Sequence, residues 1–262
     1  MSHTAIDEAK LPFWKRSHYL DRMSLRELVA AYFQHYTIIV YLAVTALCIV
    51  GFAMYPASLW QTVLSIGAAA LVYPLVWHLL HQYVLHGQWM YKIRFMSSTW
   101  KRIHYDHHQD PNHLEVLFGA LHTTLPTIAI ATLPLGWMIG GVGGALAALA
   151  TGIVTTCYYE FMHCIQHLSF KPKWKWVQFM KQRHNEHHYF DEDGNYGITN
   201  YAWDRLLGTY YEKKDRPSRS PTVFNLGYTE DIAVRWPWVK ELSGGIASGH
   251  PRRRALSRDG EG

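Results

Sequence analysis

The segment TIIVYLAVTALCIVGFAMYPASLWQTVLSIGAAALVYPLVW, residues 37–77, contains no charged side chain. No Lys, Arg, Asp or Glu occurs anywhere between Glu27 and Lys92, nor between Glu115 and Glu160. One membrane-spanning helix needs about 20 apolar residues, so each of these uncharged stretches has room for two spans. The sequence therefore predicts an all-α integral membrane protein with two helical hairpins, that is, four transmembrane helices.

Neither expected hairpin turn, YPAS at 55–58 or IGGVGG at 139–144, contains a charged residue. The basic residues lie on the opposite side: before the first span (Lys10, Lys15, Arg16, Arg22, Arg26), between the hairpins (Lys92, Arg94, Lys101, Arg102) and after Glu160. The positive-inside rule makes that side cytoplasmic, together with both termini. The net charge of +5 then reflects topology and attraction to anionic lipid, which leaves nucleic acid a poor partner. These features fit a bacterial inner membrane and the endoplasmic reticulum equally.

The chain divides into three expected parts. Residues 1–36 form a cytoplasmic N-terminal segment, 37–211 a membrane and catalytic domain, and 212–262 a cytoplasmic extension whose end has the composition of a disordered tail. In the first part Ser24 and Glu27 form a capping box ahead of helically spaced apolar residues, which predicts an interfacial helix. The alternative is that this segment begins the first span.

Ten of the 17 histidines fall in four clusters. These are HQYVLH with His81 and His86, HYDHH with His104, His107 and His108, HCIQH with His163 and His167, and HNEHH with His184, His187 and His188. Residues at i, i+3 and i+4 share one face of a helix, so three clusters can aim their rings at a common point. The spacing of five in HQYVLH turns about 140°, so His81 and His86 converge only if the helix ends or unwinds near Leu85 and Gly87.

All four clusters lie at or just beyond the cytoplasmic ends of the expected spans, so they can meet in one site. One zinc ion takes about four ligands, so ten histidines are too many for a single zinc site. They match two metal ions that each have a larger number of ligands. A His-Glu-x-x-His hydrolase motif is absent from the sequence, and imidazole also suits iron, so a redox-active iron pair is the favoured interpretation. The other histidines, His3, His18, His35, His78, His113, His122 and His250, are expected to have ordinary roles, although His78 lies one turn before His81.

A metal pair at the membrane surface is placed to act on a molecule whose tail stays in the lipid. Oxidation of an unactivated C–H bond is a reaction that needs such metals, and it consumes O2 and two electrons. The sequence holds no flavin or nicotinamide fingerprint, so the electrons are expected from a separate carrier.

The four motifs in this order, closed by GNYGITNYAWDRLLGTYY, resemble the fatty acid hydroxylase and sterol desaturase superfamily of integral-membrane non-haem di-iron enzymes. The resemblance covers residues 75–211. It implies a cytoplasmic helical cap holding two Fe ions, with Zn as an alternative in the purified protein, and O2 as co-substrate. It further implies a lipid substrate and an electron donor such as a ferredoxin or a small haem protein. Asn195 is then expected near the metals, and Asp204 and Arg205 are expected to tie down the cap.

Within the superfamily the motifs point in two directions. The gap in HQYVLH resembles the fatty acid 2-hydroxylase and carotenoid hydroxylase branches, whereas HHYFDEDGNYG resembles the ending of sterol desaturases and methyl oxidases. A fatty-acid or acyl-lipid hydroxylase is the first hypothesis, with a carotenoid hydroxylase or a sterol desaturase or oxidase as the alternative. Two classes outside lipid oxidation are a metal transporter or sensor, whose sites usually lie near the bilayer midplane, and a bis-histidine haem protein.

Overall fold

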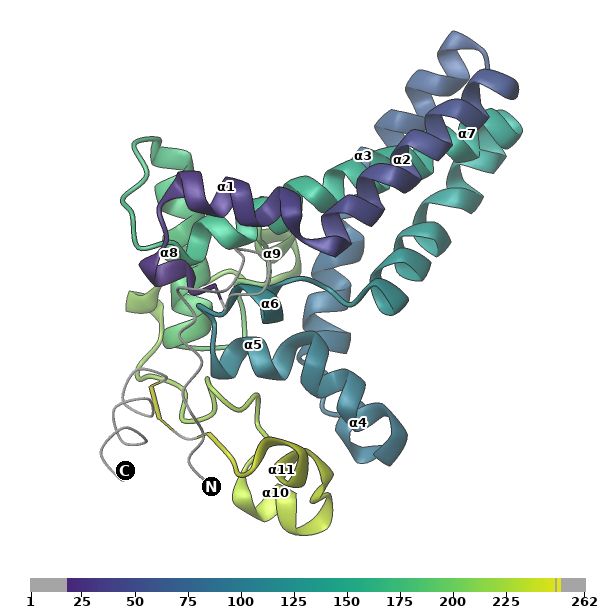
Figure 1. Cartoon of the computed structure of the whole chain (residues 1–262). Coiled ribbons are helices and arrows are strands. Elements are labelled where there is room, and N and C mark those ends of the chain that lie inside the picture. The colour runs from purple at the N-terminus through teal and green to yellow at the C-terminus, as the bar shows by residue number, and fades with distance from the viewer. Residues whose placement is uncertain (1–17, 248, 251–262) are drawn as a thin grey trace, which may run out of the picture.

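The computed structural model describes residues 18–247, 249 and 250, and every regular element in that part of the chain is a helix (Figure 1). Three helices are long and apolar enough to cross a membrane, judged by length and composition. They are α2 (Tyr36–Met54), α3 (Leu59–Leu80) and α7 (Leu121–His167), and they run side by side towards one end of the molecule. The prediction of an all-helical chain with membrane-spanning helices is thus confirmed.

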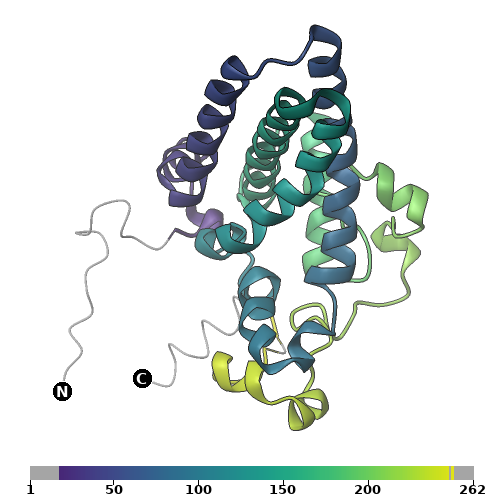
Figure 2. The same ribbon diagram turned by 90° about the vertical axis from the view of Figure 1, so that its right-hand side faces the viewer.

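Helix α7 is itself a hairpin. Gly140 and Gly141 have non-helical backbone angles, and φ is +58° at Gly141, a left-handed conformation that glycine adopts without strain. Figure 2 shows the two teal limbs of α7 lying between α2 and α3. The limbs touch through small residues, since a Cβ atom on Gly136 would lie 2.2 Å from the carbonyl oxygen of Gly144. The reversal falls in the IGGVGG segment, where the sequence predicts a turn.

The N-terminal helix α1 (Leu25–Gln34) begins with the predicted capping box, in which Ser24 and Glu27 cap each other. It ends at His35, whose extended backbone separates α1 from α2. Therefore α1 is a distinct helix and not the start of the first span. Its side chains Phe33 and Leu25 remain exposed.

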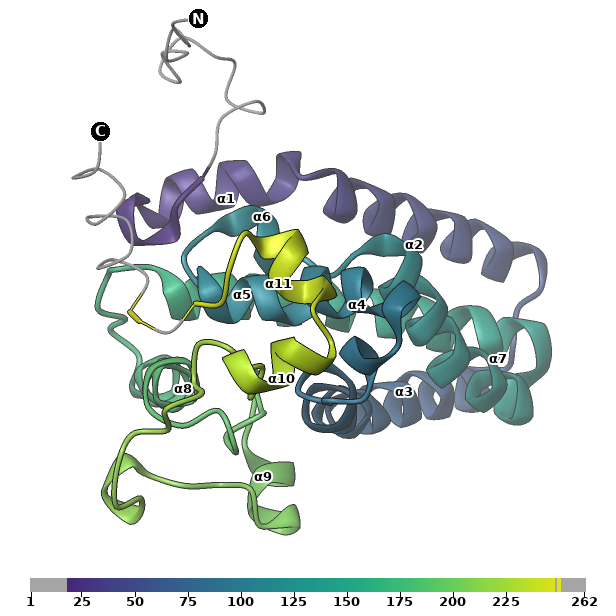
Figure 3. The ribbon, with the colours of Figure 1, turned by 90° about the horizontal axis from the view of Figure 1, so that it is seen from below.

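A helical cap covers one end of the long helices. It contains α4 (Arg94–Trp100), α5 (Asp106–Gln109), α6 (Leu114–Leu117), α8 (Lys175–Tyr189) and α9 (Ala202–Leu207). The short helices α10 (Glu230–Arg235) and α11 (Trp238–Ser243) lie beside α4 (Figure 3). An aromatic core of Tyr91, Trp100, Tyr105 and Tyr228 joins them, so much of the expected C-terminal extension is folded onto the cap. The segment for which a disordered end is expected lies mostly outside the described residues.

Candidate metal centre

Two π-helical turns position the first two histidine clusters. η4 (His81–Leu85) directly continues α3, and η6 (Lys101–Tyr105) continues α4. The wider turn of η4 brings the rings of His81 and His86 to a centroid distance of 5.0 Å. The prediction that the helix must unwind here is confirmed. The π turn in HYDHH was not predicted, because the spacing of its histidines also fits a regular α-helix.

The remaining histidines come from α5, from the end of α7 and from α8. All ten clustered histidines meet at the junction of the cap and the long helices. They form three overlapping groups that could hold metal ions: His107, His163, His167, His184 and His188; His81, His86, His104 and His187; and His108, His187 and His188. Nine of the ten are buried, and His86 is partly buried.

The spacing within each group suits a metal ion. The potential ligand atoms of a group lie within 4.8 Å of one another. Two imidazole nitrogens bound on opposite sides of one ion are about 4.2 Å apart, because each metal–nitrogen bond is about 2.1 Å long. His187 and His188 each belong to two groups, so the groups are neighbours and the arrangement suits two ions close together.

Backbone carbonyl groups fix the orientation of three of these rings. His187 Nδ1 donates to the Gly194 carbonyl oxygen at 2.7 Å, and His81 Nδ1 donates to that of Tyr196 at 2.6 Å. His108 Nδ1 donates to the Val223 carbonyl oxygen at 3.0 Å. In a neutral ring with its proton on Nδ1, the Nε2 atom carries a lone pair, as a metal ligand must.

Ring nitrogen atoms of the cluster lie in close contact with one another. His104 Nε2 lies 3.1 Å from His81 Nε2 and 2.9 Å from His86 Nε2, and the Nε2 atoms of His167 and His184 are 2.9 Å apart. Burial holds the pKa of the cap histidines well below its usual range, and that of His108 falls to about 3. The rings are therefore neutral at pH 7.

Several of these buried nitrogens have no hydrogen-bond partner among the described residues, including both ring nitrogens of His107 and of His188. Unpaired buried polar atoms are unfavourable. A cation between the rings would give these nitrogen atoms a partner. The donor set, its burial and its spacing thus fit metal ions.

The acidic turn after HNEHH supports this cluster from outside. Both polar atoms of the buried Asn195 side-chain amide bond to the main chain of Tyr211: Nδ2 donates to its carbonyl oxygen at 3.0 Å, and Oδ1 accepts from its N–H at 3.1 Å. Asp204 accepts hydrogen bonds from the backbone of Tyr196 and Gly197. These residues therefore hold the turn that supplies carbonyl partners to His187 and His81.

Two other sequence-predicted positions differ in role from the clustered histidines. Arg205 is exposed and packs over the Tyr210 ring at 4.3 Å, so Asp204 makes the buried contacts of the predicted lock. His78 is buried, but it faces Asp204 Oδ2 at 3.5 Å and joins none of the three groups.

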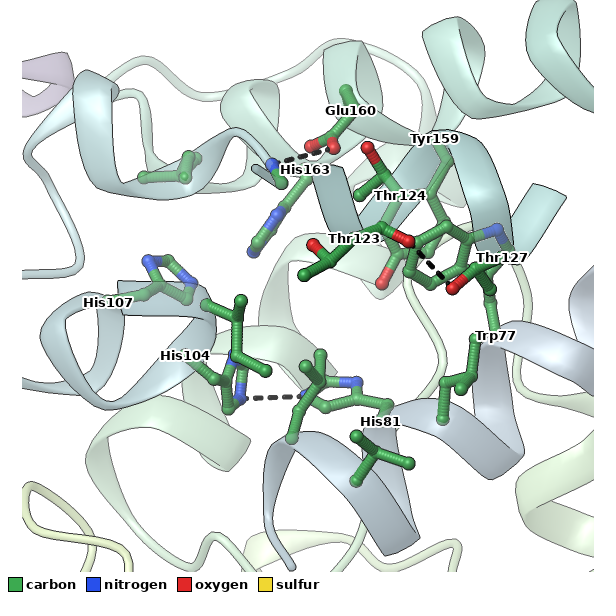
Figure 4. A pocket seen from close by; sticks show the side chains of 16 residues that line it. Trp77, His81, His104, His107, Thr123, Thr124, Thr127, Tyr159, Glu160 and His163 are labelled. Carbon is green, nitrogen blue, oxygen red and sulfur yellow. Dashed lines mark hydrogen bonds between the residues drawn. The ribbon is translucent and has the colours of Figure 1, made fainter. Parts of the chain in front are cut away.

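A cavity of about 100 Å³ lies between the histidines and the long helices (Figure 4). Histidines of both larger groups line it: His81 and His104 of one, His107 and His163 of the other. Its remaining wall comes mainly from α3, η4 and α7: Trp77, Leu80, Val84, Leu85, Thr123, Thr124, Thr127, Tyr159 and Glu160. The histidine cluster is therefore open to a mostly apolar space on the side of the long helices.

A second cavity, of about 360 Å³, touches the cluster at one histidine. His167 lines it together with Lys181, Asn185 and Tyr189. The latter three also line a neighbouring cavity of about 530 Å³, to which Lys171 and Lys213 contribute. One clustered histidine is thus reached from a cavity whose charged lining is Lys181 and Asp21.

Comparison with known proteins decides the family. The fatty acid hydroxylase family matches residues 66–209, more than half of the chain. The chain belongs to the fatty acid hydroxylase family. All ten clustered histidines lie within the matched residues, so the centre described above is part of the fatty acid hydroxylase domain.

Curated relatives carry related names. The chain is 27% identical over 146 residues to the ceramide very long chain fatty acid hydroxylase SCS7 of Saccharomyces cerevisiae, covering 53% of this chain and 36% of the yeast protein. It is 27% identical over 154 residues to the dihydroceramide fatty acyl 2-hydroxylase FAH2 of Arabidopsis thaliana, covering 57% of this chain and 61% of the plant protein. The matches therefore span about a third and three fifths of these relatives.

A solved structure shares the fold. Full-length scs7p, of which only the hydroxylase domain is visible, superposes with a TM-score of 0.60 at 20% identity, over 79% of this chain and 84% of that chain. At this identity the likeness supports the fold of the fatty acid hydroxylase domain and not its substrate.

Tyr159 and Glu160 of the fatty acid hydroxylase domain belong to no histidine motif, so they are not among the site residues predicted from the sequence. Both line the cavity beside His163. The available signal was Glu160 itself, a carboxylate at the end of an uncharged stretch and one helical turn before His163.

Proposed function

We propose that this member of the fatty acid hydroxylase family is a membrane-bound di-iron oxygenase that hydroxylates a C–H bond of a fatty acid or acyl lipid. One observation carries the proposal. The cavity beside the long helices is lined by histidines of both larger groups, so one bound molecule would contact both metal positions.

In this proposal all ten clustered histidines are metal ligands. One ion is held by His107, His163, His167, His184 and His188, and the other by His81, His86, His104 and His187. His108 is the tenth ligand, because its ring nitrogen groups with those of His187 and His188. Two iron ions bound there would supply the chemistry that side chains lack, the removal of hydrogen from an unactivated C–H bond with O2 as oxidant. Overall, one O2, two electrons and two protons convert the C–H group to C–OH and release one water.

The residues of the chain bind and orient the substrate. Trp77, Leu80 and Leu85 offer an apolar wall to an acyl chain, and they keep water away from the reacting carbon. Holding a flexible chain in one orientation against the metals accounts for positional specificity. Asn195 acts indirectly, because it holds the turn whose carbonyl groups orient His81 and His187.

The proposed topology has four membrane crossings, made by α2, α3 and the two limbs of α7. The cap and both termini then lie in the cytoplasm, as the distribution of Lys and Arg favours. Residues 1–36 form the cytoplasmic N-terminal segment with the interfacial helix α1, residues 37–211 form the membrane and catalytic domain, and residues 212–262 form a cytoplasmic extension. The exposed apolar side chains Leu25, Val29 and Phe33 on α1 support contact with lipid.

A separate electron carrier completes the proposed reaction. The cavity that reaches His167 is the proposed place of its approach. Its charged lining is Lys181 and Asp21, and in the neighbouring cavity Lys171, Lys181 and Lys213 outnumber Glu186. Positive charge there would attract an acidic ferredoxin or small haem protein.

Lipid mass spectrometry tests the function. Cells producing the wild-type chain and the His187→Ala variant are compared, with a working electron donor present, and metal is measured in both purified proteins. A lipid that gains one oxygen atom only with the wild-type chain supports the proposal. Identical lipids, with metal still bound to the wild-type protein, would favour a metal transporter or sensor.

A further inference from the structure

The sequence KWKW, residues 173–176, spans the start of α8 and lies at the surface of the cap. Trp174 is 77% exposed and Trp176 is 45% exposed, although tryptophan side chains are buried in most proteins. Lys173 and Lys175 are exposed as well, and neither forms an ion pair with a described residue. The metal centre uses none of these four side chains. We refer to residues 173–176 as the Lys–Trp segment.

Contacts on the inner side hold the backbone next to the Lys–Trp segment. Pro172 is buried, and its carbonyl oxygen accepts a hydrogen bond from Gln178 Nε2 at 2.6 Å. Phe170 packs against the hydrophobic core to which Leu28 and Ala31 of α1 contribute. Figures 1 and 3 show the connection from α7 to α8 beside the N-terminal end of α1. The exposed lysines and tryptophans are therefore presented on an ordered base, close to α1.

Helix α1 carries an exposed apolar stripe near this segment. Leu25, Val29 and Phe33 are spaced four residues apart, so they lie along one side of the helix, and all three are exposed. Helix α2, which is long and apolar enough to cross a membrane, begins directly after α1 at Tyr36. The stripe thus leads into a candidate membrane span, and the Lys–Trp segment extends the same region of the surface.

The charge around the Lys–Trp segment has one sign. No Asp or Glu occurs from residue 161 to residue 185, whereas five basic residues do: Lys171, Lys173, Lys175, Lys181 and Arg183. Lysine binds lipid phosphate through its ammonium group, and tryptophan rings favour the boundary between headgroups and acyl chains. The position next to α1 and α2 places both kinds of side chain at that boundary, which favours a lipid surface over a protein as the partner.

We infer that the Lys–Trp segment docks on the anionic headgroup surface of the bilayer. Its lysines contact lipid phosphate groups, and its tryptophans enter the boundary with the acyl chains. The segment and α1 then anchor the cap at two adjacent places. The contact holds the start of α8, the helix that carries HNEHH, and it does not depend on which molecule occupies the cavity beside the histidines.

Lipid binding by the purified full-length protein in detergent tests this inference. Phosphatidylglycerol and phosphatidylcholine with the same acyl chains are titrated separately, and their dissociation constants are measured by native mass spectrometry. Because the chains are equal, the ratio of the two constants reports the headgroup. The wild type should prefer phosphatidylglycerol. The Lys173→Gln/Lys175→Gln protein should lose about thirtyfold of that preference, since each lysine at an anionic surface contributes about fivefold.

A second pair of lysines provides the matched control. Lys214→Gln/Lys240→Gln changes the net charge equally, but these lysines pair with Glu212 and Glu230, so the preference should stay at the wild-type value. Trp174→Ala should weaken the binding of both lipids by the same factor, because the ring contributes burial and not charge. An unfolding temperature matched to the wild type shows that each variant is intact.

Two results would overturn the inference. One is equal affinity of the wild type for the two lipids. The other is a preference for phosphatidylglycerol that Lys173→Gln/Lys175→Gln leaves intact. If this variant also loses binding to a small acidic ferredoxin while its lipid preference is unchanged, the Lys–Trp segment belongs to a protein partner instead.

Discussion

The Nδ1 atom of His187 and the carbonyl oxygen of Gly194 lie 2.7 Å apart, and this bond ties the histidine cluster to the acidic turn that follows it. His187 belongs to two of the three histidine groups, so its ring orientation affects both metal positions. The same turn holds His81 through the Tyr196 carbonyl oxygen. The geometry of the turn therefore sets the geometry of the centre.

Substitution of Asn195 is expected to loosen this turn. Asn195→Ala removes both bonds to the Tyr211 main chain and places alanine at φ +52°. Buried backbone groups left unpaired and a left-handed alanine together destabilise by about 3 kcal/mol. Thermal unfolding in detergent should show a lower midpoint, and bound metal should fall.

Asn200→Ala is the matched control, because Asn200 makes its side-chain bond to Ala202 at the surface. An Asn195→Ala protein with the unfolding midpoint and metal content of the Asn200→Ala protein would contradict the assigned role.

Acidification should destabilise the cap. Burial lowers the pKa of His104, His107, His184, His187 and His188, and lowers that of His108 to about 3, whereas an unfolded histidine titrates near about 6.5. The unfolded chain thus binds more protons below pH about 6.5. The contribution of the neutral histidines to the free energy of unfolding is fully present above that pH. It falls as the pH drops towards about 3, by about 1.4 kcal/mol per pH unit for each histidine involved.

Protonation of His113 instead stabilises the folded chain, because its hydrogen bond to Glu115 raises its pKa. This single residue opposes the six histidines whose pKa is lowered. Unfolding midpoints and metal content measured from pH 8 to pH 5 check the expected fall. A midpoint that stays constant or rises on acidification would show that the cluster is not buried in its neutral form.

The α7 hairpin depends on close contact between its limbs. Gly136→Leu should prevent that contact, because a Cβ atom there would lie 2.2 Å from the Gly144 carbonyl oxygen and 2.6 Å from the Ala148 Cβ atom. Size-exclusion chromatography in detergent should show loss of folded protein. Gly67→Leu on α3 should remain folded, since no atom lies within 4 Å of the corresponding position. Equal yields of the two folded variants would contradict the hairpin packing.

Removal of a histidine inside the cluster should differ from removal of one outside it. His107→Ala should lower metal content and abolish hydroxylation, because His107 belongs to the five-histidine group and lines the cavity. His250→Ala should leave the metal content unchanged, since His250 stacks on Tyr189 and joins no histidine group. Full turnover by the His107→Ala protein would remove His107 from the ligand set.

Sequence patterns predicted the parts of the fold that depend on local chemistry. Charge-free stretches located α2, α3 and the hairpin of α7, and Ser24 with Glu27 located the start of α1. Histidine spacing identified all ten residues that the fold brings together, because each cluster needs only one or two turns of helix to align. The spacing of His81 and His86 even required the unwinding that η4 provides.

The unpredicted features depend on contacts between distant segments. The Val223 carbonyl oxygen meets His108 across 115 positions of the chain, and no local pattern records that approach. Tyr159 and Glu160 lie on α7, and only the packing of α7 against α3 reveals the cavity they line. Arg205 was expected to share the lock with Asp204, but its side chain is exposed.

The most direct test of the centre is the amount and coordination of its metal. The chain is purified from iron-supplemented cells, metal is quantified per chain, and X-ray absorption at the iron edge reports the bound atoms. The account predicts about two iron ions per chain, with nitrogen ligands at about 2.1 Å and no sulfur ligand. One ion or none per chain in folded protein, or coordination that includes sulfur, would contradict a two-metal centre built from these ten histidines.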